Sequence, residues 1–542
     1  MVSTNIIRTF FLISIVSLSA SAQENRYMVF FADKEGVPFS AAEPIEFLSE
    51  KAIDRRLRQG IDISEQDFPV NTAYVAGIRD AGAGTFFTSR WMNGVLIQCD
   101  PGVLPSVESL PYVDRVEMVA PLPKLQSGGR RSFSFRRKNN QAGSETESQL
   151  KMIGVDRMHE GDYKGKGVNI AILDSGFPGV NTSPAFQHIF SDDRFSEDVS
   201  YDFVHNGADV FQYDDHGTEV LSVIAAEIPD AFTGGAHEAT FQLYITEDVP
   251  TEYRIEEYNW LFAAERADSA GVDIIHSSLG YYDFDDVTMN YSREQMDGKT
   301  TVVSRAAQWA ADRGILVVTS AGNEGAIDTW RIITAPADAK DLLAIGAVNS
   351  ALQKTSSSSI GPAADNRIKP DLAALGAGVK VVKASGQIST SSGTSLAAPL
   401  ITSLAAGVWQ RYPDLTNKEV IALLKQTASQ ANNPDNLLGY GIPNFQAVVN
   451  FQEQTPQLAE FEIFPNPLVD DTLTISPFDP GVIETCDIEI ISAHGRVLGR
   501  DTAHFNWLNR NYKTDMSGLA SGIYYIRVFH EKRRHTFRLV KL

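Results

Sequence analysis

The sequence predicts an α/β protein with an open parallel sheet and helices on both faces, preceded by a small α+β unit and followed by a small β-sandwich. Three observations predict this. Between residues 149 and 452, nearly all-apolar segments of strand length alternate with helical segments, as expected for strands covered on both faces. Before that region strands and helices alternate over residues 23–124, and after Gln452 short strands follow one another. A chain of 542 residues is long enough for two to four folded units.

The first residues have the pattern of a secretory signal peptide. Arg8 supplies a positive charge, residues 10–18 form an apolar stretch, and Ala20-Ser21-Ala22 is an A-x-A cleavage site. The stretch is too short for a membrane span, which needs roughly 20 apolar residues. We therefore expect residues 1–22 to be removed, and we expect no transmembrane segment in the remainder.

Residues 23–124 predict the small α+β unit. The sequence predicts, in order, a strand (YMVFFAD), a helix over 44–60 that ends at Gly60, a helix over 72–82, a strand pair turned at Asn93-Gly94, a short helix near 103–110 and a last strand (VDRVEMVAP).

Residues 125–148 differ in composition from this unit. They are polar, basic at first and poor in large aliphatic side chains. They predict an exposed linker, and its arginines are either a solvated loop or a processing site.

Residues 149–452 predict the central sheet. The segments VNIAILD, DIIHSSLG, GILVVTSAGN and LLAIGAV are nearly all apolar, and helical segments such as EEYNWLFAAERADSAG and TVVSRAAQWAADRG lie between them. This alternation is typical of parallel strands joined by helices. Residues 453–542 contain short alternating strands separated by turns, which predict the β-sandwich.

Charge and cysteine content exclude several classes of function. The formal net charge is −21 and the isoelectric point about 4.9, so we expect no nucleic acid partner, because phosphate binding needs a basic face. Two cysteines, Cys99 and Cys486, allow neither a disulfide framework nor a cysteine-rich zinc site. They can form one bridge or remain two separate buried thiols.

Three residues lie where an open parallel sheet forms its sites, beyond the carboxyl ends of strands or at the start of a helix. Asp174 ends the strand VNIAILD, His216 opens an apolar helix, and Ser395 follows Gly393 at the start of another apolar helix. Each alone is more often a cap or turn residue. Together they supply a nucleophile, a base that takes its proton and a carboxylate that orients the base.

The segments around these residues, AILDSGF, DDHGTEV and SGTSLAAP, resemble the three signature segments of the subtilisin family of serine endopeptidases. HSSLG at 276–280 resembles the family's substrate-binding strand, and SAGNEG at 320–325 resembles its oxyanion-hole loop. The resemblance implies a subtilisin-like α/β core and hydrolysis of peptide bonds through an acyl-enzyme by Asp174, His216 and Ser395.

The same resemblance implies roles for further residues. Asn323 would donate its amide to the oxyanion beside the backbone N–H of Ser395, and Ser278, Leu279 and Gly280 would pair with the substrate backbone. No cofactor is implied for the chemistry and no metal ligand is assigned; relatives often hold structural calcium, but no acidic segment has a pattern that places it. Leu396 stands where many relatives carry Met, an apolar side chain of similar volume, so the implied activity is unaffected. Trp330 and Arg331 are bulky in a stretch whose counterparts help line the family's primary specificity pocket, so the shape of that pocket is not implied.

The flanking units also resemble known domains. Residues 23–124 are similar in size and element order to propeptides of secreted subtilisins. FPNP at 464–467, SAHGRVL at 492–498 and SGIYYIRV at 521–528 resemble the sorting domain that type IX secretion systems recognise. The resemblance implies a protein exported through the periplasm to the cell surface or medium, with the type IX machinery and protein or peptide substrates as partners.

Two other functions compete with the peptidase. A catalytically silent, subtilisin-like surface protein would act as a binding module, but it would be free to lose any of the four residues Asp174, His216, Asn323 and Ser395. An esterase or lipase would place the serine first in the chain, in a G-x-S-x-G turn, and this chain does not. We expect His205, His237 and His276 to have packing or surface roles, and Asp214 and Asp215 to charge the start of the helix at His216.

Overall fold

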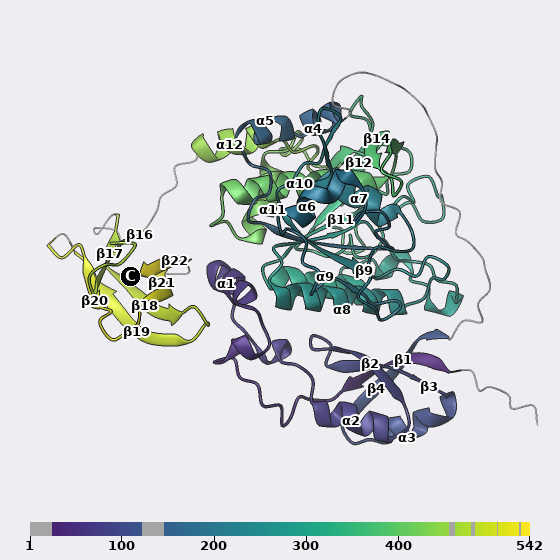
Figure 1. Ribbon diagram of the computed structural model, residues 1–542, viewed down its shortest axis with the longest axis horizontal. Helices are drawn as coiled ribbons and strands as arrows, with labels where there is room; N and C mark the ends of the chain where they lie inside the picture. Colours follow the sequence, from purple (N-terminus) through teal and green to yellow (C-terminus); the bar gives the residue numbers. More distant parts are fainter. Residues whose placement is uncertain (1–23, 122–145, 455–460, 479–482, 507, 531–532) are drawn as a thin grey trace, which may run out of the picture.

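The computed structural model describes residues 24–121, 146–454, 461–478, 483–506, 508–530 and 533–542 (Figure 1). They form three units in the predicted order, an α+β unit, an α/β unit with a parallel sheet and a unit of antiparallel strands. The predicted signal peptide at 1–22 and all but residues 146–148 of the predicted linker lie outside the described residues.

The first unit is a four-stranded antiparallel sheet in the order β2-β3-β1-β4 with two helices against it. Its elements are β1 (Asn25–Phe31), α1 (Glu50–Gln59), α2 (Thr72–Asp80), β2 (Gly84–Ser89), β3 (Gly94–Cys99), α3 (Leu104–Glu108) and β4 (Val113–Pro121). The helix expected over 44–60 begins later, at Glu50, because Ser49 caps it by accepting a hydrogen bond from the Ala52 N–H at 3.2 Å. It ends as expected at Gly60, whose φ of +69° favours glycine.

The second unit contains a seven-stranded sheet in the order β13-β12-β11-β10-β5-β9-β6, with every pair parallel. The strands are β5 (Asn169–Asp174), β6 (Tyr201–Asp202), β9 (Thr240–Ile245), β10 (Ile274–Ser277), β11 (Leu316–Ser320), β12 (Leu343–Val348) and β13 (Leu372–Leu375). Two short hairpins accompany them, β7 (Glu227–Ile228) with β8 (Phe232–Thr233) and β14 (Val379–Val382) with β15 (Ile388–Ser391).

Helices cover both faces of this sheet. They are α4 (Glu147–Met152), α5 (Val155–Glu160), α6 (Gln187–Ser191), α7 (His216–Ala225), α8 (Ile255–Ala270), α9 (Val302–Asp312), α10 (Thr394–Arg411), α11 (Asn417–Gln426) and α12 (Phe445–Gln454). Alternate residues of β5 enter different cores, Ile170 and Ile172 with α7 and α10, and Ala171 and Leu173 with α8 and α9. This explains why β5 is apolar at nearly every position.

The first unit packs on α8, on the side away from the sheet (Figure 1). The Glu265 carboxylate accepts hydrogen bonds from Ser89 Oγ at 2.5 Å and from the Arg90 N–H at 2.8 Å. Asp268 is fully buried and pairs with the guanidinium groups of Arg55, Arg56 and Arg90. Burial raises the pKa of Asp268, but these cations outweigh it and hold that pKa well below its usual range. The first unit contributes the buried arginines and the second unit the buried carboxylate. Removing one of these charges would leave the others buried without compensation, so the ion pairs fix how the first unit docks.

The third unit has two facing antiparallel sheets around one core. One sheet contains β16 (Phe461–Phe464), β17 (Thr472–Pro477) and β20 (Tyr512–Asp515), and the other contains β18 (Thr485–Ser492), β19 (Val497–His504), β21 (Gly522–His530) and β22 (Arg533–Lys541). Ile491 and Tyr525 of this unit join Leu48, Ile53 and Leu57 around α1 in a small apolar cluster. Cys99 and Cys486 are both buried free thiols, so the structure contains no bridge between them.

Candidate active site

Asp174 lies at the carboxyl end of β5, between β9 and β10, where parallel strands place functional side chains. Its side chain is fully buried, and its Oδ1 accepts hydrogen bonds from the Ser175 N–H at 2.8 Å and from Ser175 Oγ at 3.2 Å. The same oxygen is 2.8 Å from Nδ1 of His216. Three polar contacts therefore stabilise the charge of this buried carboxylate through Oδ1, whereas its Oδ2 has no hydrogen-bond partner among the described residues.

His216 is the first residue of α7, and the structure shows why it is held beside Asp174. Its backbone N–H donates to Asp214 Oδ1 at 3.0 Å, which anchors the start of the helix. Gly217 lets the two segments approach, because a Cβ there would lie 2.4 Å from the carbonyl oxygen of Gly176 and 3.0 Å from Cβ of Asp174. The helix start thus presents the imidazole with Nδ1 toward the carboxylate.

The electrostatics of the imidazole depend on three carboxylates. Burial lowers the pKa of His216, but the Asp174 carboxylate, its hydrogen bond, and the charges of Asp214 and Asp215 outweigh burial and raise that pKa above its usual range. A raised pKa means that the neutral ring binds a proton more strongly. The arrangement therefore makes His216 a stronger base than a free histidine.

Ser395 is the second residue of α10, a helix buried along most of its length. Gly393, just before the helix, has a φ of +151°, which glycine adopts readily. Ser395 Oγ donates to the carbonyl oxygen of Ser278 at 3.2 Å, and among the described residues no hydrogen bond joins it to His216. The structure thus brings Asp174 and His216 into direct contact and places the Ser395 hydroxyl against the backbone of Ser278.

Asn323 follows β11 in an exposed loop and reaches the start of α10. Its Oδ1 accepts hydrogen bonds from the Thr394 N–H at 3.0 Å and from Thr394 Oγ1 at 3.1 Å. These two bonds orient the amide, and among the described residues its Nδ2 makes no hydrogen bond. The first N–H groups of α10 have no carbonyl one turn earlier to bond, so this end of the helix favours negative charge.

Ser278, Leu279 and Gly280 continue the chain from β10 past Asp174. Ser278 Oγ donates to the carbonyl oxygen of Ser395 at 2.9 Å, so this segment and α10 are joined in both directions. A Cβ at Gly280 would lie 2.2 Å from Oγ1 of Thr334, so the position requires glycine. The chain then forms a backbone pair between Tyr281 and Ala335, with N···O distances of 2.8 and 3.2 Å.

His276 supports this segment from inside the core. It is fully buried, with Nδ1 2.8 Å from Thr402 Oγ1 on α10 and Nε2 2.9 Å from Ser278 Oγ. Burial lowers the pKa of His276 to about 3, so the ring stays neutral. The expected packing role is confirmed, and His276 in addition contacts two hydroxyl groups, that of Thr402 on α10 and that of Ser278 after β10. A histidine inside an otherwise apolar strand was the signal that polar partners surround it.

Other expectations for side chains near the site are also resolved. His237 is buried against the carbonyl oxygen of Gly234, and His205 lies 3.0 Å from Asp202 Oδ2, so neither belongs to the site. Trp330 is buried and stacks on Tyr282 with ring centroids 4.3 Å apart.

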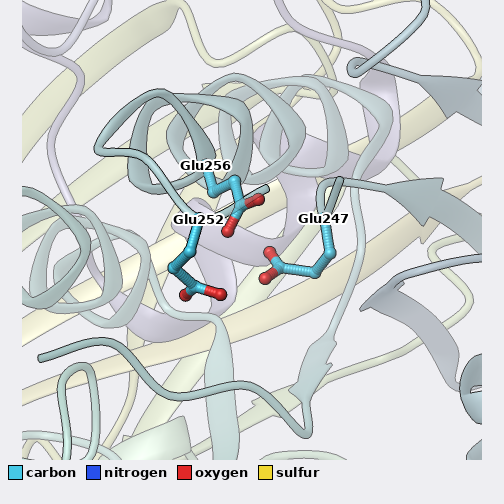
Figure 2. A group of neighbouring side chains, drawn as sticks. All are labelled: Glu247, Glu252 and Glu256. Carbon is cyan, nitrogen blue, oxygen red and sulfur yellow. The ribbon is translucent and has the colours of Figure 1, made fainter. Parts of the chain in front are cut away.

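Ser175 was missed by sequence reasoning, although it links Asp174 to Asp214 through its hydroxyl. Among the described residues, Glu247 and Glu252, which lie between β9 and α8, and Glu256, in the first turn of α8, bring their carboxylates close enough to share a cation (Figure 2).

Three family models match parts of this chain. Residues 165–441 match the model of the subtilase family, residues 26–138 match the peptidase S8 propeptide domain of Bacteroidota, and residues 462–541 match the secretion system C-terminal sorting domain. The propeptide match extends into the predicted linker. Among the described helices, none combines the length and apolar composition that crossing a membrane requires.

Individual relatives cover the central unit. Subtilisin NAT of Bacillus subtilis subsp. natto is 28% identical over 306 residues, which is 55% of this chain and 70% of that protein. A subtilisin of Bacillus pumilus is 28% identical over 305 residues, 55% of this chain and 96% of that protein. The crystal structure of a mutant of the epidermin leader peptide processing serine protease from Staphylococcus aureus has a TM-score of 0.57 at 15% identity, covering 80% of this chain and all of that one. This last likeness shows the fold alone.

Proposed function

Because the chain belongs to the subtilase family, we propose that it cleaves peptide bonds through an acyl-enzyme with Asp174, His216 and Ser395 as its catalytic triad. It is a serine protease, a hydrolase acting on peptide bonds, with an N-terminal propeptide unit and a C-terminal sorting domain of the type IX kind. The sorting domain and the propeptide indicate a secreted or cell-surface protein. The observation that carries the triad assignment is the 2.8 Å contact between the buried Asp174 carboxylate and His216 Nδ1.

The proposed reaction begins with the serine proton. Asp174 holds Nδ1–H of His216, which leaves Nε2 unprotonated and able to accept the proton of Ser395. For this, Ser395 exchanges its bond to the Ser278 carbonyl for one to His216. Catalytic hydrogen bonds commonly tighten only when substrate is bound. Ser395 Oγ attacks the carbonyl carbon, the amine leaves with the proton from His216, and water hydrolyses the resulting ester by the same steps.

Two donors would stabilise the oxyanion formed in each attack. The side-chain amide of Asn323 is oriented by its two bonds to Thr394, and the backbone N–H of Ser395 lies at the start of α10. Donors fixed before the charge appears need no reorganisation in the transition state. Ser278, Leu279 and Gly280 would pair with the substrate as an added strand, which holds the scissile bond against Ser395.

The pH dependence of activity should report on the imidazole of His216. Activity requires neutral His216, so kcat/KM rises with pH through the pKa of this residue. Replacing Asp215 by Asn removes one of the negative charges that raise this pKa, so the acidic limb should move to lower pH, by about a few tenths of a unit for a partly exposed charge. The measurement is a pH profile of kcat/KM on a neutral peptide. Glu197→Gln, a carboxylate-to-amide change at an exposed position elsewhere, should leave the acidic limb of the profile in place. An acidic limb that moves to higher pH in Asp215→Asn would contradict the assignment of this limb to His216.

The sorting domain should be separable from the peptidase. A chain that ends at Gln454 keeps α12, whose Phe445, Val448 and Val449 pack in the core of the central unit. We expect this chain to retain peptidase activity but to be no longer released by its normal route, because the last unit has its own core. Activity of the purified, refolded protein and its location in the producing cell are the measurements. Loss of activity in correctly folded protein would show that the last unit belongs to the catalytic fold.

The proposed function is tested by mapping cleavages in a mixed peptide library by mass spectrometry. The secreted protein should cut within peptides, and the Ser395→Ala protein should leave the same library intact. The catalytically silent alternative predicts no cleavage by either protein. Cleavage by both would assign the activity to a contaminant and overturn the proposal.

A further inference from the structure

Pro399 leaves the backbone carbonyl of Ser395 without its partner in the helix. In a regular α-helix this carbonyl would accept a hydrogen bond from the N–H four residues later, but that residue is Pro399, which has no N–H. Ser278 Oγ supplies a donor instead, 2.9 Å from the carbonyl oxygen of Ser395. A side chain from the segment after β10 therefore holds the backbone of Ser395 at the start of α10.

His276 contacts the same hydroxyl group from inside the core. It belongs to β10 and is fully buried, and its Nε2 lies 2.9 Å from Ser278 Oγ. A serine hydroxyl has one hydrogen, and Ser278 donates that hydrogen to the carbonyl of Ser395, which can only accept. The oxygen of Ser278 must therefore accept from His276, so the ring carries its proton on Nε2.

The second ring nitrogen is consistent with this assignment. Burial lowers the pKa of His276 to about 3, so the ring is neutral and has one N–H. Nδ1 is then an acceptor, and Thr402 Oγ1 donates to it across 2.8 Å. The bonds run in one direction, from Thr402 through His276 and Ser278 to the carbonyl of Ser395. Bonds in such a chain strengthen one another.

Ser278 also contacts Ser395 through its backbone. Its carbonyl oxygen accepts a hydrogen bond from Ser395 Oγ at 3.2 Å, and this is the bond that Ser395 must exchange for one to His216 in the proposed reaction. The hydroxyl and the carbonyl of Ser278 thus hold both the backbone and the side chain of Ser395. A change in the position of Ser278 would therefore displace the attacking oxygen.

We propose that His276 is a positioning residue for Ser395, which acts by holding the hydroxyl of Ser278 in the direction of the Ser395 carbonyl. The inference rests on the proposed role of Ser395 as the nucleophile. Because the ring of His276 is fully buried, it contributes through Ser278 and not by contact with the substrate. Positioning of this kind contributes to the rate because small displacements of reacting atoms are costly.

The opposite face of β10 offers a matched control. Ser277, the neighbour of His276, is equally buried, and its Oγ accepts a hydrogen bond from Trp260 Nε1 of α8 at 2.9 Å. Successive residues of a strand point to opposite faces, so this bond faces away from α10. Ser277→Ala removes a buried hydrogen bond from the same strand without touching the chain of bonds to Ser395. It should lower the melting temperature and leave kcat unchanged.

The test uses the secreted protein and measures kcat and KM on one peptide, the rate at which a fluorophosphonate labels Ser395, and the melting temperature. His276→Met removes both ring nitrogens and leaves a flexible apolar side chain that adapts to the core. His276→Gln keeps an N–H donor that can reach Ser278. Ser278→Ala removes the hydroxyl itself and is made alone and together with His276→Met.

We expect His276→Met to lower kcat by about tenfold or more, up to the ~10²-fold that a misplacement of about 1 Å can cost. KM should change little, the labelling rate of Ser395 should fall with kcat, and the acidic limb of the pH profile should stay in place because the ring of His276 is neutral. His276→Gln should restore most of kcat. In the Ser278→Ala background, His276→Met should cause no further loss, because both changes act through one hydroxyl.

Several outcomes would overturn this proposal and leave the triad in place. They are a His276→Met protein as fast as the parent, a His276→Gln protein no faster than His276→Met, and full additivity in the double variant. An equal loss of kcat in Ser277→Ala and His276→Met would also overturn it, because the effect would then come from disruption of the core. An inactive and unlabelled parent would instead overturn the proposed function, and this inference with it.

Discussion

Replacing Ser395 by Ala should lower peptide hydrolysis by about 10⁶-fold, the magnitude known from subtilisin itself. Without its Oγ, the site contains a base and an oxyanion hole but no nucleophile that forms the acyl-enzyme. If maturation is autocatalytic, the same protein should also keep its first unit attached. The unit is bound through buried ion pairs between Asp268 and three arginines. Rate measurements on a peptide substrate and the intact mass of the purified protein test both expectations.

The control for Ser395→Ala is the combination with His216→Ala. The effects of replacing residues that act as one unit are not additive. The double variant should therefore hydrolyse the peptide no more slowly than Ser395→Ala alone. A further large loss would mean that His216 acts separately from Ser395. If the Ser395→Ala precursor is still trimmed, another protease performs the processing, and autocatalytic maturation is wrong while the triad stands.

Replacing Asn323 by Ala should lower kcat by about 10²–10³-fold with little change in KM, again a magnitude taken from subtilisin. The amide of Asn323 is matched to a charge that exists only during attack, so it contributes to the transition state and little to substrate binding. Steady-state kinetics on one peptide gives both constants. Near-normal kcat with intact folding by circular dichroism would show that the stabilising donor lies elsewhere.

Asn323→Asp separates the chemical role of this residue from its structural one. An aspartate can still accept the two bonds from Thr394, so the loop should remain in place, but it offers no donor and repels the oxyanion. We expect it to be at least as damaging as Asn323→Ala. Higher activity in Asn323→Asp than in Asn323→Ala would mean that the contact with Thr394 matters more than the donor.

The central strands could be predicted where burial on both faces leaves a continuous apolar run, as in β5 and β12. The central strand β9 was not recognised, because Gln242 interrupts its apolar run. Its Oε1 accepts a hydrogen bond from Tyr244 Oη, two residues further along the same strand, which satisfies a buried polar group. The edge strands β6 and β13 have two and four residues, too few for a periodic signal.

The candidate site could be located in the sequence because its residues sit in short local patterns, a strand end for Asp174 and helix starts for His216 and Ser395. What could not be predicted depends on contacts across the fold. The bond from Ser395 to the Ser278 carbonyl joins segments 117 residues apart.

Activation of Ser395 by His216 is tested with a fluorophosphonate probe that reacts only with activated serines. The mature protein is labelled, digested, and the modified peptide identified by mass spectrometry. We expect one adduct, on Ser395, that disappears in His216→Ala, while Glu197→Gln, the change at an exposed carboxylate, is labelled like the parent. An unlabelled protein that still cleaves peptides, or an adduct on another serine, would contradict it.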